Sequence, residues 1–423
     1  MKLTPPRAIA ALVGLALVLS GCAAGAPSPS GSQSQGDANT NASGTGEHCA
    51  DAEAPLSSLE LLDAPRTATG GATACLASDA VATINDTTAP ALPITVTDAE
   101  GREVTVTDVS RILALDVSGT IAATVFGLGL GPNVIGRDAS TGFAGTETLP
   151  VVTAAGHTLS AEAILALGPT VILTDTTIGP KEVRQQLRDA GIPVVMISSD
   201  RRIDTAGALV TEVAGALGVV PRGEALAARL GGEVEAARAE VAAIAPAEAS
   251  DRVRVVFLYA RGNANVYYIF GADSGADSLI DAIGATDVAT EIGWTGMKPM
   301  SAEALVAAQP DALIMMTDGL ASVGGVDGLL ERIPALAQTP AGKNKRVIDM
   351  ADDEVFSFGP RSAQIVRALA KALYAVPSAA GAGAGAAAAA TAAAPAADDC
   401  PPIPRPRQPR SRLRRHRHPP PRT

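Results

Sequence analysis

Histidine is almost absent from this chain. It occurs four times in 423 residues, and His157 is the only one between positions 49 and 415. Zinc and manganese sites need several histidine and carboxylate ligands that converge on the ion. A single histidine in the middle of the chain therefore argues against such a site. It also leaves His157 to be explained, since an isolated histidine is more often structural or simply exposed.

Aromatic residues are scarce as well, at 3% of the chain, against 47% hydrophobic and 18% charged residues. The cores must therefore be built from Ala, Val, Leu and Ile. The composition is that of a globular protein, and the length allows two or three domains. The net charge of −11, which includes the eight arginines of 405–422, argues against nucleic acid as a partner, because phosphate binding needs clustered Lys and Arg.

The signature motifs of several enzyme classes are missing. The chain contains no G-x-S-x-G elbow, no Walker loop and no H-E-x-x-H, which mark hydrolases, nucleotide hydrolases and zinc proteases. GLGLGPNVIG at 127–136 approximates a dinucleotide fingerprint, but its spacing differs and it follows a predicted helix rather than a strand. We interpret it as a turn and expect that the chain is not an enzyme.

Residues 1–21 have the pattern of a lipoprotein signal peptide. Lys2 and Arg7 flank the start of the apolar run AIAALVGLALVL, and LSGC follows it. The run is too short for a permanent membrane span. LSGC resembles the lipobox of bacterial lipoproteins, in which the cysteine, here Cys22, receives a diacylglyceryl group; two acyl chains give stable anchoring. An ordinary secretory signal with an incidental cysteine is the alternative.

Residues 22–91 are predicted to be a flexible tether, because 23–47 are rich in Ser, Gly, Ala and Asn. Cys49 and Cys75 could close a loop within it outside the reducing cytosol, although the sequence does not prove the pairing. At the other end, residues 377–423 are of low complexity and cannot form a packed core. This tail is either the product of a frameshift or a basic appendage that could contact anionic surfaces.

Between these ends the pattern is that of an α/β protein. ITVTDAEGREVTVTD predicts a hairpin around Gly101. RILALD, NVIGRD, TVILTD and PVVMISS, and later RVRVVFLYA, DALIMMTD and KRVIDMA, are buried-strand patterns that alternate with helical ones. We predict two Rossmann-like lobes with mostly parallel sheets, at 92–220 and 250–376, joined by one long helix at 221–249.

An internal repeat supports two lobes. LSAEAILALGPTVIL (159–173) aligns without gaps on MSAEALVAAQPDALI (300–314). Each copy predicts a capped helix start, one helix, a proline turn and a buried strand. Chance similarity in an alanine-rich chain is the alternative, but the shared register of Glu162 with Glu303 argues against it.

These features together resemble the substrate-binding proteins of ABC importers, in the class with a rigid connecting helix. Within that class the chain is most similar to the haem-binding lipoproteins of actinobacterial haem importers. The similar stretches are GPNVIGRDASTGFAGTETLPVVTAAGHTLSAEAIL, VVFLYARGNANVYYIFG and GWTGMKPMSAEALVAAQPDALIMMTDG. The resemblance implies a monomer, lipid-anchored at the cell surface on the outer face of the cytoplasmic membrane. It would deliver ferric haem b to an ABC permease and its ATPase, and upstream haem-transfer surface proteins could supply it.

The resemblance also implies the ligands of the haem iron. In those proteins a His of the first lobe and a Tyr of the second hold the iron, and an Arg two residues after the Tyr hydrogen-bonds its phenolic oxygen. The matching residues here are His157, Tyr259 and Arg261. Neutral imidazole and phenolate both suit ferric iron, and both the iron and a fixed guanidinium charge stabilise a phenolate. The sequence identifies no partner for the second nitrogen of His157.

Further candidates follow from strand ends and predicted loops, where ligands bind in open α/β sheets. Core packing is the alternative for the Met and Phe residues among them, and Arg137 is a candidate partner of a haem propionate. The resemblance also implies that Glu162 and Glu303 meet arginines of the permease, which is compatible with a role at helix starts. A siderophore or cobalamin binder of the same class is the nearest alternative, and an adhesive lipoprotein without a ligand is another. The candidate haem-pocket residues are Arg137, Thr174, Thr176, Trp294, Met297, Met315, Met316, Phe356 and Phe358.

Overall fold

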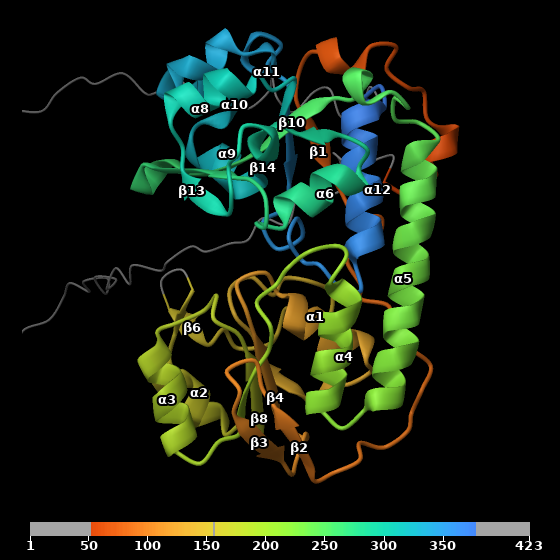
Figure 1. Cartoon of the computed structure of the whole chain (residues 1–423). Helices are drawn as coiled ribbons and strands as arrows, with labels where there is room; N and C mark the ends of the chain where they lie inside the picture. Colours follow the sequence, from red (N-terminus) through yellow and green to blue (C-terminus); the bar gives the residue numbers. More distant parts are fainter. Residues whose placement is uncertain (1–51, 155–156, 378–423) are drawn as a thin grey trace, which may run out of the picture. The chain divides into compact units, whose positions relative to one another are not determined.

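The computed structural model describes residues 52–154 and 157–377 (Figure 1). The signal peptide, Cys22, Cys49 and the tail from 378 lie outside these ranges, so what the sequence predicts for them stays a prediction. The described residues form two α/β lobes with a long helix between them in the chain, which confirms the predicted fold class.

The first lobe is built on a four-stranded parallel sheet with the order β5-β4-β8-β9. Three of its strands are buried at every position, as expected for parallel strands that are covered on both faces. Each strand coincides with one of the apolar patterns of the sequence. The strands are β4 (Ile112–Leu115), β5 (Val134–Gly136), β8 (Val171–Thr174) and β9 (Val194–Met196), and the helices are α1 (Thr120–Gly127), α2 (Ala161–Leu167), α3 (Lys181–Asp189) and α4 (Ala206–Ala216).

Two small antiparallel pairs accompany this sheet. β2 (Ile94–Thr97) and β3 (Glu103–Val106) form the predicted hairpin, whose turn contains Gly101 at a φ of 76°, a conformation that glycine adopts without strain. β6 (Thr153–Ala154) pairs with β7 (Thr158–Leu159). His157 directly precedes β7, so this short pair determines where the histidine lies.

The second lobe contains a seven-stranded sheet of the order β1-β15-β14-β10-β11-β13, with β12 paired to β10. Its pairings are parallel except at β10–β11 and β11–β13, which are antiparallel. The sheet is therefore mostly parallel, as predicted. The strands are β1 (Ala72–Ala74), β10 (Arg254–Arg261), β11 (Val266–Phe270), β12 (Thr286–Asp287), β13 (Met297–Pro299), β14 (Ala312–Met316) and β15 (Val347–Met350), and the helices are α6 (Ala276–Ala282), α7 (Val288–Glu291), α8 (Ala302–Ala308), α9 (Thr317–Ser322), α10 (Gly325–Arg332), α11 (Pro340–Lys343) and α12 (Ser362–Tyr374).

The connecting helix α5 (Val220–Ala242) has 23 residues and packs against α4 of the first lobe and α12 of the second. It ends at Ala242 rather than at the predicted 249. Pro246 explains the early end, because proline lacks the backbone donor of a helix and disfavours helical geometry in the residue before it. Residues Ala249–Asp251 form a separate 3-10 turn.

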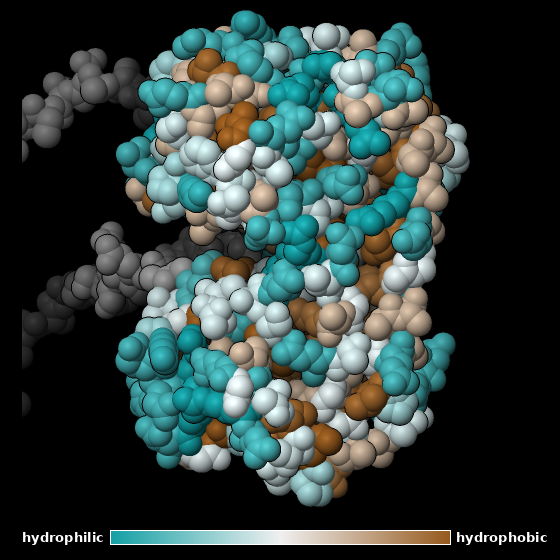
Figure 2. All heavy atoms as spheres, viewed as in Figure 1, coloured by the Kyte–Doolittle hydropathy of each residue, from teal (hydrophilic) through white to brown (hydrophobic). Residues whose placement is uncertain are grey.

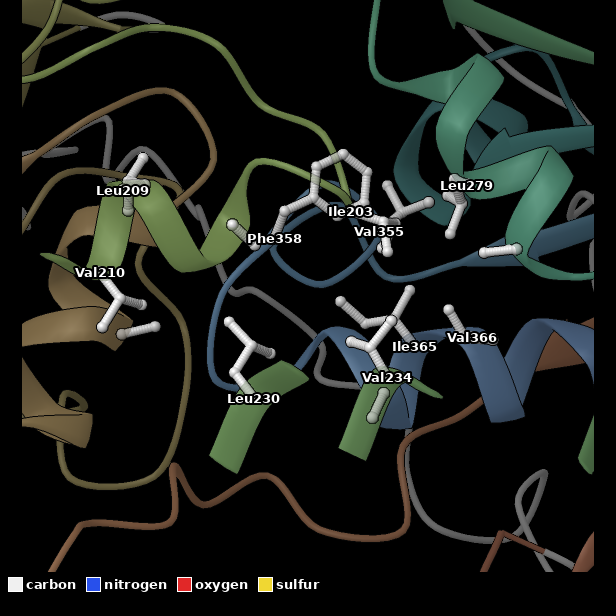
Figure 3. Close-up of a cluster of buried hydrophobic side chains, with 14 of the residues drawn as sticks. Ile203, Leu209, Val210, Leu230, Val234, Leu279, Val355, Phe358, Ile365 and Val366 are labelled. Atoms are coloured by element: carbon white, nitrogen blue, oxygen red, sulfur yellow. The ribbon is translucent and has the colours of Figure 1, made fainter. Parts of the chain in front are cut away.

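One buried apolar cluster includes residues of both lobes and of α5. In Figure 3, Leu209 of α4 and Leu230 of α5 belong to the same cluster as Leu279 of α6 and Ile365 of α12. Close-packed interiors resist deformation. A continuous core of this kind favours modest rocking of the lobes over a wide swing.

Residues 52–91 correct the predicted tether, because they are a structured strap on the body. Leu56 is 2% exposed, and β1 of this segment pairs with β15 at the edge of the second sheet. Arg222 of α5 donates to the carbonyl oxygens of Thr88 and Leu128. Residues 52–91 are held in place by contacts with β15 and α5, which lie far away in the sequence. The Gly-, Thr- and Ala-rich composition of the segment does not reveal these contacts.

Cys75 lies directly after β1 and is disulfide-bonded. Its partner lies outside the described residues. The predicted pairing with Cys49 therefore stays a prediction. The structure shows that Cys75 follows a strand of the sheet and does not lie in a flexible tether.

The internal repeat is confirmed at atomic level. The Oγ of Ser160 accepts a hydrogen bond from the Ala163 amide at the start of α2, and the Oγ of Ser301 accepts one from the Ala304 amide at the start of α8. Each helix ends on a residue in the left-handed conformation, Gly168 or Gln309, and a buried strand follows.

The surface in Figure 2 is largely hydrophilic, most clearly over α3, whose sequence is KEVRQQLRD. Across 52–154 and 157–377, no helix combines the length and the hydropathy that a membrane crossing requires.

Candidate ligand-binding site

Tyr259 and Arg261 lie on the same face of β10, because alternate residues of a strand point to the same side. The guanidinium carbon of Arg261 is 4.5 Å from the centre of the Tyr259 ring. Tyr259 is half-buried and lies opposite Tyr268 of β11 in the register of the sheet. The sequence expectation that these two side chains are neighbours agrees with this geometry.

Arg261 makes a different contact from the one that the resemblance implied. Its Nη2 forms an ion pair with Asp352, which lies after β15, and its Nη1 donates to the Ala260 carbonyl at 3.0 Å. The Asp352 carboxylate also accepts from the Asp318 amide at 2.9 Å. Burial raises the pKa of Asp352, and the charge of Arg261 opposes this effect. The guanidinium therefore covers the face of the Tyr259 ring while Asp352 holds its outer end.

Six aromatic rings form one connected cluster around Tyr259. This is most of the aromatic content of a chain that has one Trp, four Tyr and six Phe. The ring of Tyr259 is stacked on Phe270 with centroids 6.2 Å apart, and Phe270 stacks on Phe356 at 5.4 Å. Phe257, Phe270 and Phe358 are buried, and they support the half-buried rings of Tyr259, Tyr268 and Phe356. The cluster consists of Phe257, Tyr259, Tyr268, Phe270, Phe356 and Phe358.

His157 is exposed, and its Nδ1 lies 3.4 Å from the Oγ of Ser140. Neighbouring groups shield only part of the imidazole, and this partial desolvation lowers the pKa of His157. The positive charge of Arg261 lowers the pKa further, whereas Asp116 acts in the opposite direction. The neutral imidazole, which is the form that binds metals, is therefore favoured at neutral pH. Arg261 of the second lobe is close enough to act electrostatically on the histidine of the first.

A buried acidic cluster lies at the carboxyl ends of the first sheet. Asp116, Asp138 and Asp175 are all fully buried, and the Arg201 guanidinium is 2.5 Å from Asp175 and 3.4 Å from Asp116. Burial, with the nearby charge of Asp116, raises the pKa of Asp138 to about 7 and that of Asp175 to about 6.

Sequence reasoning missed this cluster, although RILALD, NVIGRD and TVILTD each end in one of these aspartates. Within 52–154 and 157–377, no set of three or more His, Cys, Asp or Glu side chains is placed to hold a metal ion.

Several nominated pocket residues are core residues instead. Thr174 and Phe358 are 1% exposed and Met315 is fully buried, because strand ends in this fold still lie under neighbouring elements. The Nε1 of Trp294 donates to the Ile269 carbonyl at 3.1 Å. For Thr174, Phe358 and Met315 the expectation of a ligand wall gives way to core packing, whereas Trp294 is half-buried and its nomination stays a prediction.

The other nominated residues keep accessible side chains. Thr176 and Met297 are exposed, and Met297 pairs with Phe270 in the sheet. Met316 is half-buried beside Arg261. The Nη1 of Arg137 donates to the Thr141 carbonyl at 2.9 Å and to the Asp138 carbonyl, so this guanidinium braces its own loop.

Glu162 and Glu303 are both exposed in the first turn of their helices, α2 and α8. Glu303 lines a shallow hollow of about 450 Å³ between α8 and the 3-10 turn Pro334–Gln338. The repeat therefore presents one free carboxylate on each lobe.

Known proteins resemble the chain over most of its described length. Residues 117–354 match the model of a family described as periplasmic binding protein. The crystal structure of a heme binding protein, HmuT, is 42% identical, with 73% of this chain and 99% of that chain covered and a TM-score of 0.69. Structures of HmuT variants that each lack one histidine, one arginine or one tyrosine are similar at 40 to 42% identity.

Curated relatives are more distant. An uncharacterized ABC transporter substrate-binding lipoprotein, YvrC of Bacillus subtilis, is 24% identical over 285 residues, which are 67% of this chain and 86% of that protein. A cobalamin-binding protein of Halobacterium salinarum is 24% identical over 286 residues, 67% of this chain and 74% of that protein. The chain belongs to the periplasmic binding protein family, and it is a substrate-binding protein rather than an enzyme.

Proposed function

We propose that this chain binds haem outside the cytoplasm and delivers it to an ABC permease for iron uptake. The observation that carries the proposal is the constellation of Tyr259 under the Arg261 guanidinium, with a largely neutral His157 within electrostatic reach of the same arginine. Imidazole and phenolate are both ligands of ferric haem iron.

The roles of these residues follow from their chemistry. Tyr259 supplies a phenolate oxygen, which the adjacent guanidinium charge stabilises. His157 supplies the opposite axial nitrogen. The half-buried rings of Tyr268 and Phe356 supply apolar contacts for a porphyrin beside Tyr259. The proposed cargo is haem b. Its iron is ferric, because the imidazole and phenolate pair suits ferric iron better than ferrous iron.

The similar structures support the proposal. HmuT is a heme binding protein, and in its three variants alanine replaces one histidine, one tyrosine or one arginine. In HmuT that tyrosine and that arginine are two positions apart, as Tyr259 and Arg261 are here. The three residue types that the geometry selects in this chain therefore coincide with those changed in the relative.

The surroundings of the protein follow from the same proposal. Cys22 is the lipid attachment point, and the anchor keeps the body at the outer face of the cytoplasmic membrane. Glu162 and Glu303 dock on arginines of the permease, whose ATPase drives uptake. The carrier acts as a monomer and accepts haem from solution or from upstream surface proteins.

A titration of the full chain with three ligands tests the proposal. Hemin, cyanocobalamin and a ferric hydroxamate siderophore are added separately, and binding is followed by absorbance and by quenching of Trp294 fluorescence. We expect saturable one-to-one binding of hemin alone. Saturable binding of cobalamin without hemin binding would instead favour the second candidate, which the Halobacterium relative supports.

A further inference from the structure

Ser140 is the side chain that meets the second ring nitrogen of His157. Its Oγ lies 3.4 Å from Nδ1, and its backbone lies in the loop after β5 rather than in the hairpin that carries the histidine. The contact therefore joins two separate segments of the first lobe. It leaves Nε2, on the far side of the imidazole, without this partner.

The buried carboxylate of Asp138 determines where Ser140 lies. Its Oδ1 accepts from the Ser140 amide at 2.8 Å and from the Thr141 hydroxyl at 3.1 Å, and its Oδ2 accepts from the Asp116 amide at 3.0 Å. This fully buried side chain accepts two hydrogen bonds that fix the turn of the loop and a third from the residue after β4, since an unpaired buried carboxylate would be costly.

Further contacts tie this loop to its neighbours. The Ala139 amide donates to the Thr153 hydroxyl of β6 at 3.1 Å, which joins the loop to the hairpin of His157. On the other side the Ser140 carbonyl lies against Gly119, where an added Cβ would come within 2.7 Å of it. The backbone of the loop is therefore held by several contacts, which keep the Cβ of Ser140 beside the imidazole.

We propose that Ser140 is a positioning residue for His157. The Nδ1–H of the neutral imidazole donates to the Ser140 Oγ, which fixes the ring orientation and leaves the Nε2 lone pair for the haem iron. The inference rests on the proposed function, because it assigns the second nitrogen of the proposed ligand. Groups that orient a metal-binding histidine in this way typically contribute about 10- to 100-fold to metal affinity.

Two readouts on the full chain test the proposal. The first is the tautomer of His157 in the ligand-free protein, followed by ¹⁵N NMR of the imidazole signal that His157→Ala removes. The second is the rate at which hemin leaves the loaded protein for excess apomyoglobin. Ser140→Ala removes the hydroxyl, Ser140→Thr retains it, and Ser250→Ala removes an exposed hydroxyl far away in the sequence.

We expect Ser140→Ala to shift the imidazole from the Nδ1–H towards the Nε2–H tautomer and to speed hemin loss about tenfold or more. Ser140→Thr and Ser250→Ala should keep the wild-type tautomer and lose hemin at a rate within about twofold of wild type. If hemin binds but Ser140→Ala matches wild type in both readouts, the role of Ser140 is refuted and the proposed function stands. If hemin does not bind, the proposed function fails, while the tautomer shift alone still decides whether Ser140 orients His157.

Discussion

Arg261 lies over the ring of Tyr259, 4.5 Å from its centre, and at the same time forms an ion pair with Asp352. A cation over an aromatic face is attracted by the ring, and the carboxylate holds the guanidinium in that place. One arginine thus links the strand that carries the proposed ligand to the loop of residues 351–361, which also contains Phe356 and Phe358 of the aromatic cluster.

Replacement of Arg261 by alanine should weaken hemin binding about 10- to 100-fold, the range typical of groups that support a metal ligand. Without the guanidinium, protons compete better for the phenolate, so acid should dissociate the complex at a higher pH than in wild type. Hemin titrations between pH 5 and 8 measure both effects. Arg254→Ala, on the same strand, is the control, and equal losses in the two variants would contradict the assignment.

Glu354 should make stability depend on pH. Burial raises its pKa to about 7 against the opposing charge of Arg361. Between about 4.5 and 7 the folded state then holds a proton that the unfolded state lacks, so the free energy of unfolding falls as pH rises through this window. Glu354→Gln should be more stable than wild type at pH 8 and equal to it near pH 4.5.

Urea unfolding at the two pH values measures this difference. The exposed Glu224→Gln on α5 should match wild type at both. A Glu354→Gln variant that is less stable than wild type at pH 8 would show that the attraction between the Glu354 carboxylate and the charge of Arg361 outweighs the cost of burial.

The strap of residues 52–91 should contribute to global stability. Leu56 is 2% exposed, and loss of a buried leucine side chain typically lowers the free energy of unfolding by about 2 to 5 kcal/mol. Leu56→Ala should therefore unfold at a clearly lower urea concentration than Leu165→Ala, whose side chain is 39% exposed. Indistinguishable midpoints would mean that the strap is not part of the cooperative unit.

Charge reversal at the two repeat glutamates should separate docking from ligand binding. Glu162→Lys and Glu303→Lys should bind hemin as wild type does, because both side chains are exposed in the first turns of α2 and α8. They should fail to stimulate the ATPase of the permease in proteoliposomes. The control variant Glu224→Lys should stimulate the ATPase as wild type does. Normal stimulation by a variant that combines Glu162→Lys with Glu303→Lys would exclude the docking role.

The sequence predicts the scaffold well where the signal is local. Ser160 and Ser301 cap their helices as the repeat suggested, because capping depends on residues within one turn. The sequence also indicates the buried strands, because short apolar runs between helical patterns are typical of strands in a parallel sheet. The strap was not, because β1 pairs with β15 across more than 270 positions.

The site is predicted less completely. Tyr259 and Arg261 are two residues apart on a strand, so their proximity follows from strand geometry. The aromatic cluster instead depends on the register that places Phe257 opposite Phe270 and on a loop that brings Phe356 to them. Thr174 and Met315 were nominated as strand-end residues but are buried, because position along a strand does not determine which face is covered.

The ligand pair can be tested most directly by the visible and EPR spectra of the full chain loaded with ferric hemin. We compare wild type with His157→Ala, Tyr259→Phe and Tyr268→Phe, the last as a control on the neighbouring ring. The account predicts a phenolate-to-iron charge-transfer band that only Tyr259→Phe abolishes, and an altered iron spectrum in His157→Ala. A band that survives in Tyr259→Phe, or a His157→Ala spectrum identical to wild type, would contradict the assignment of these residues as the axial ligands.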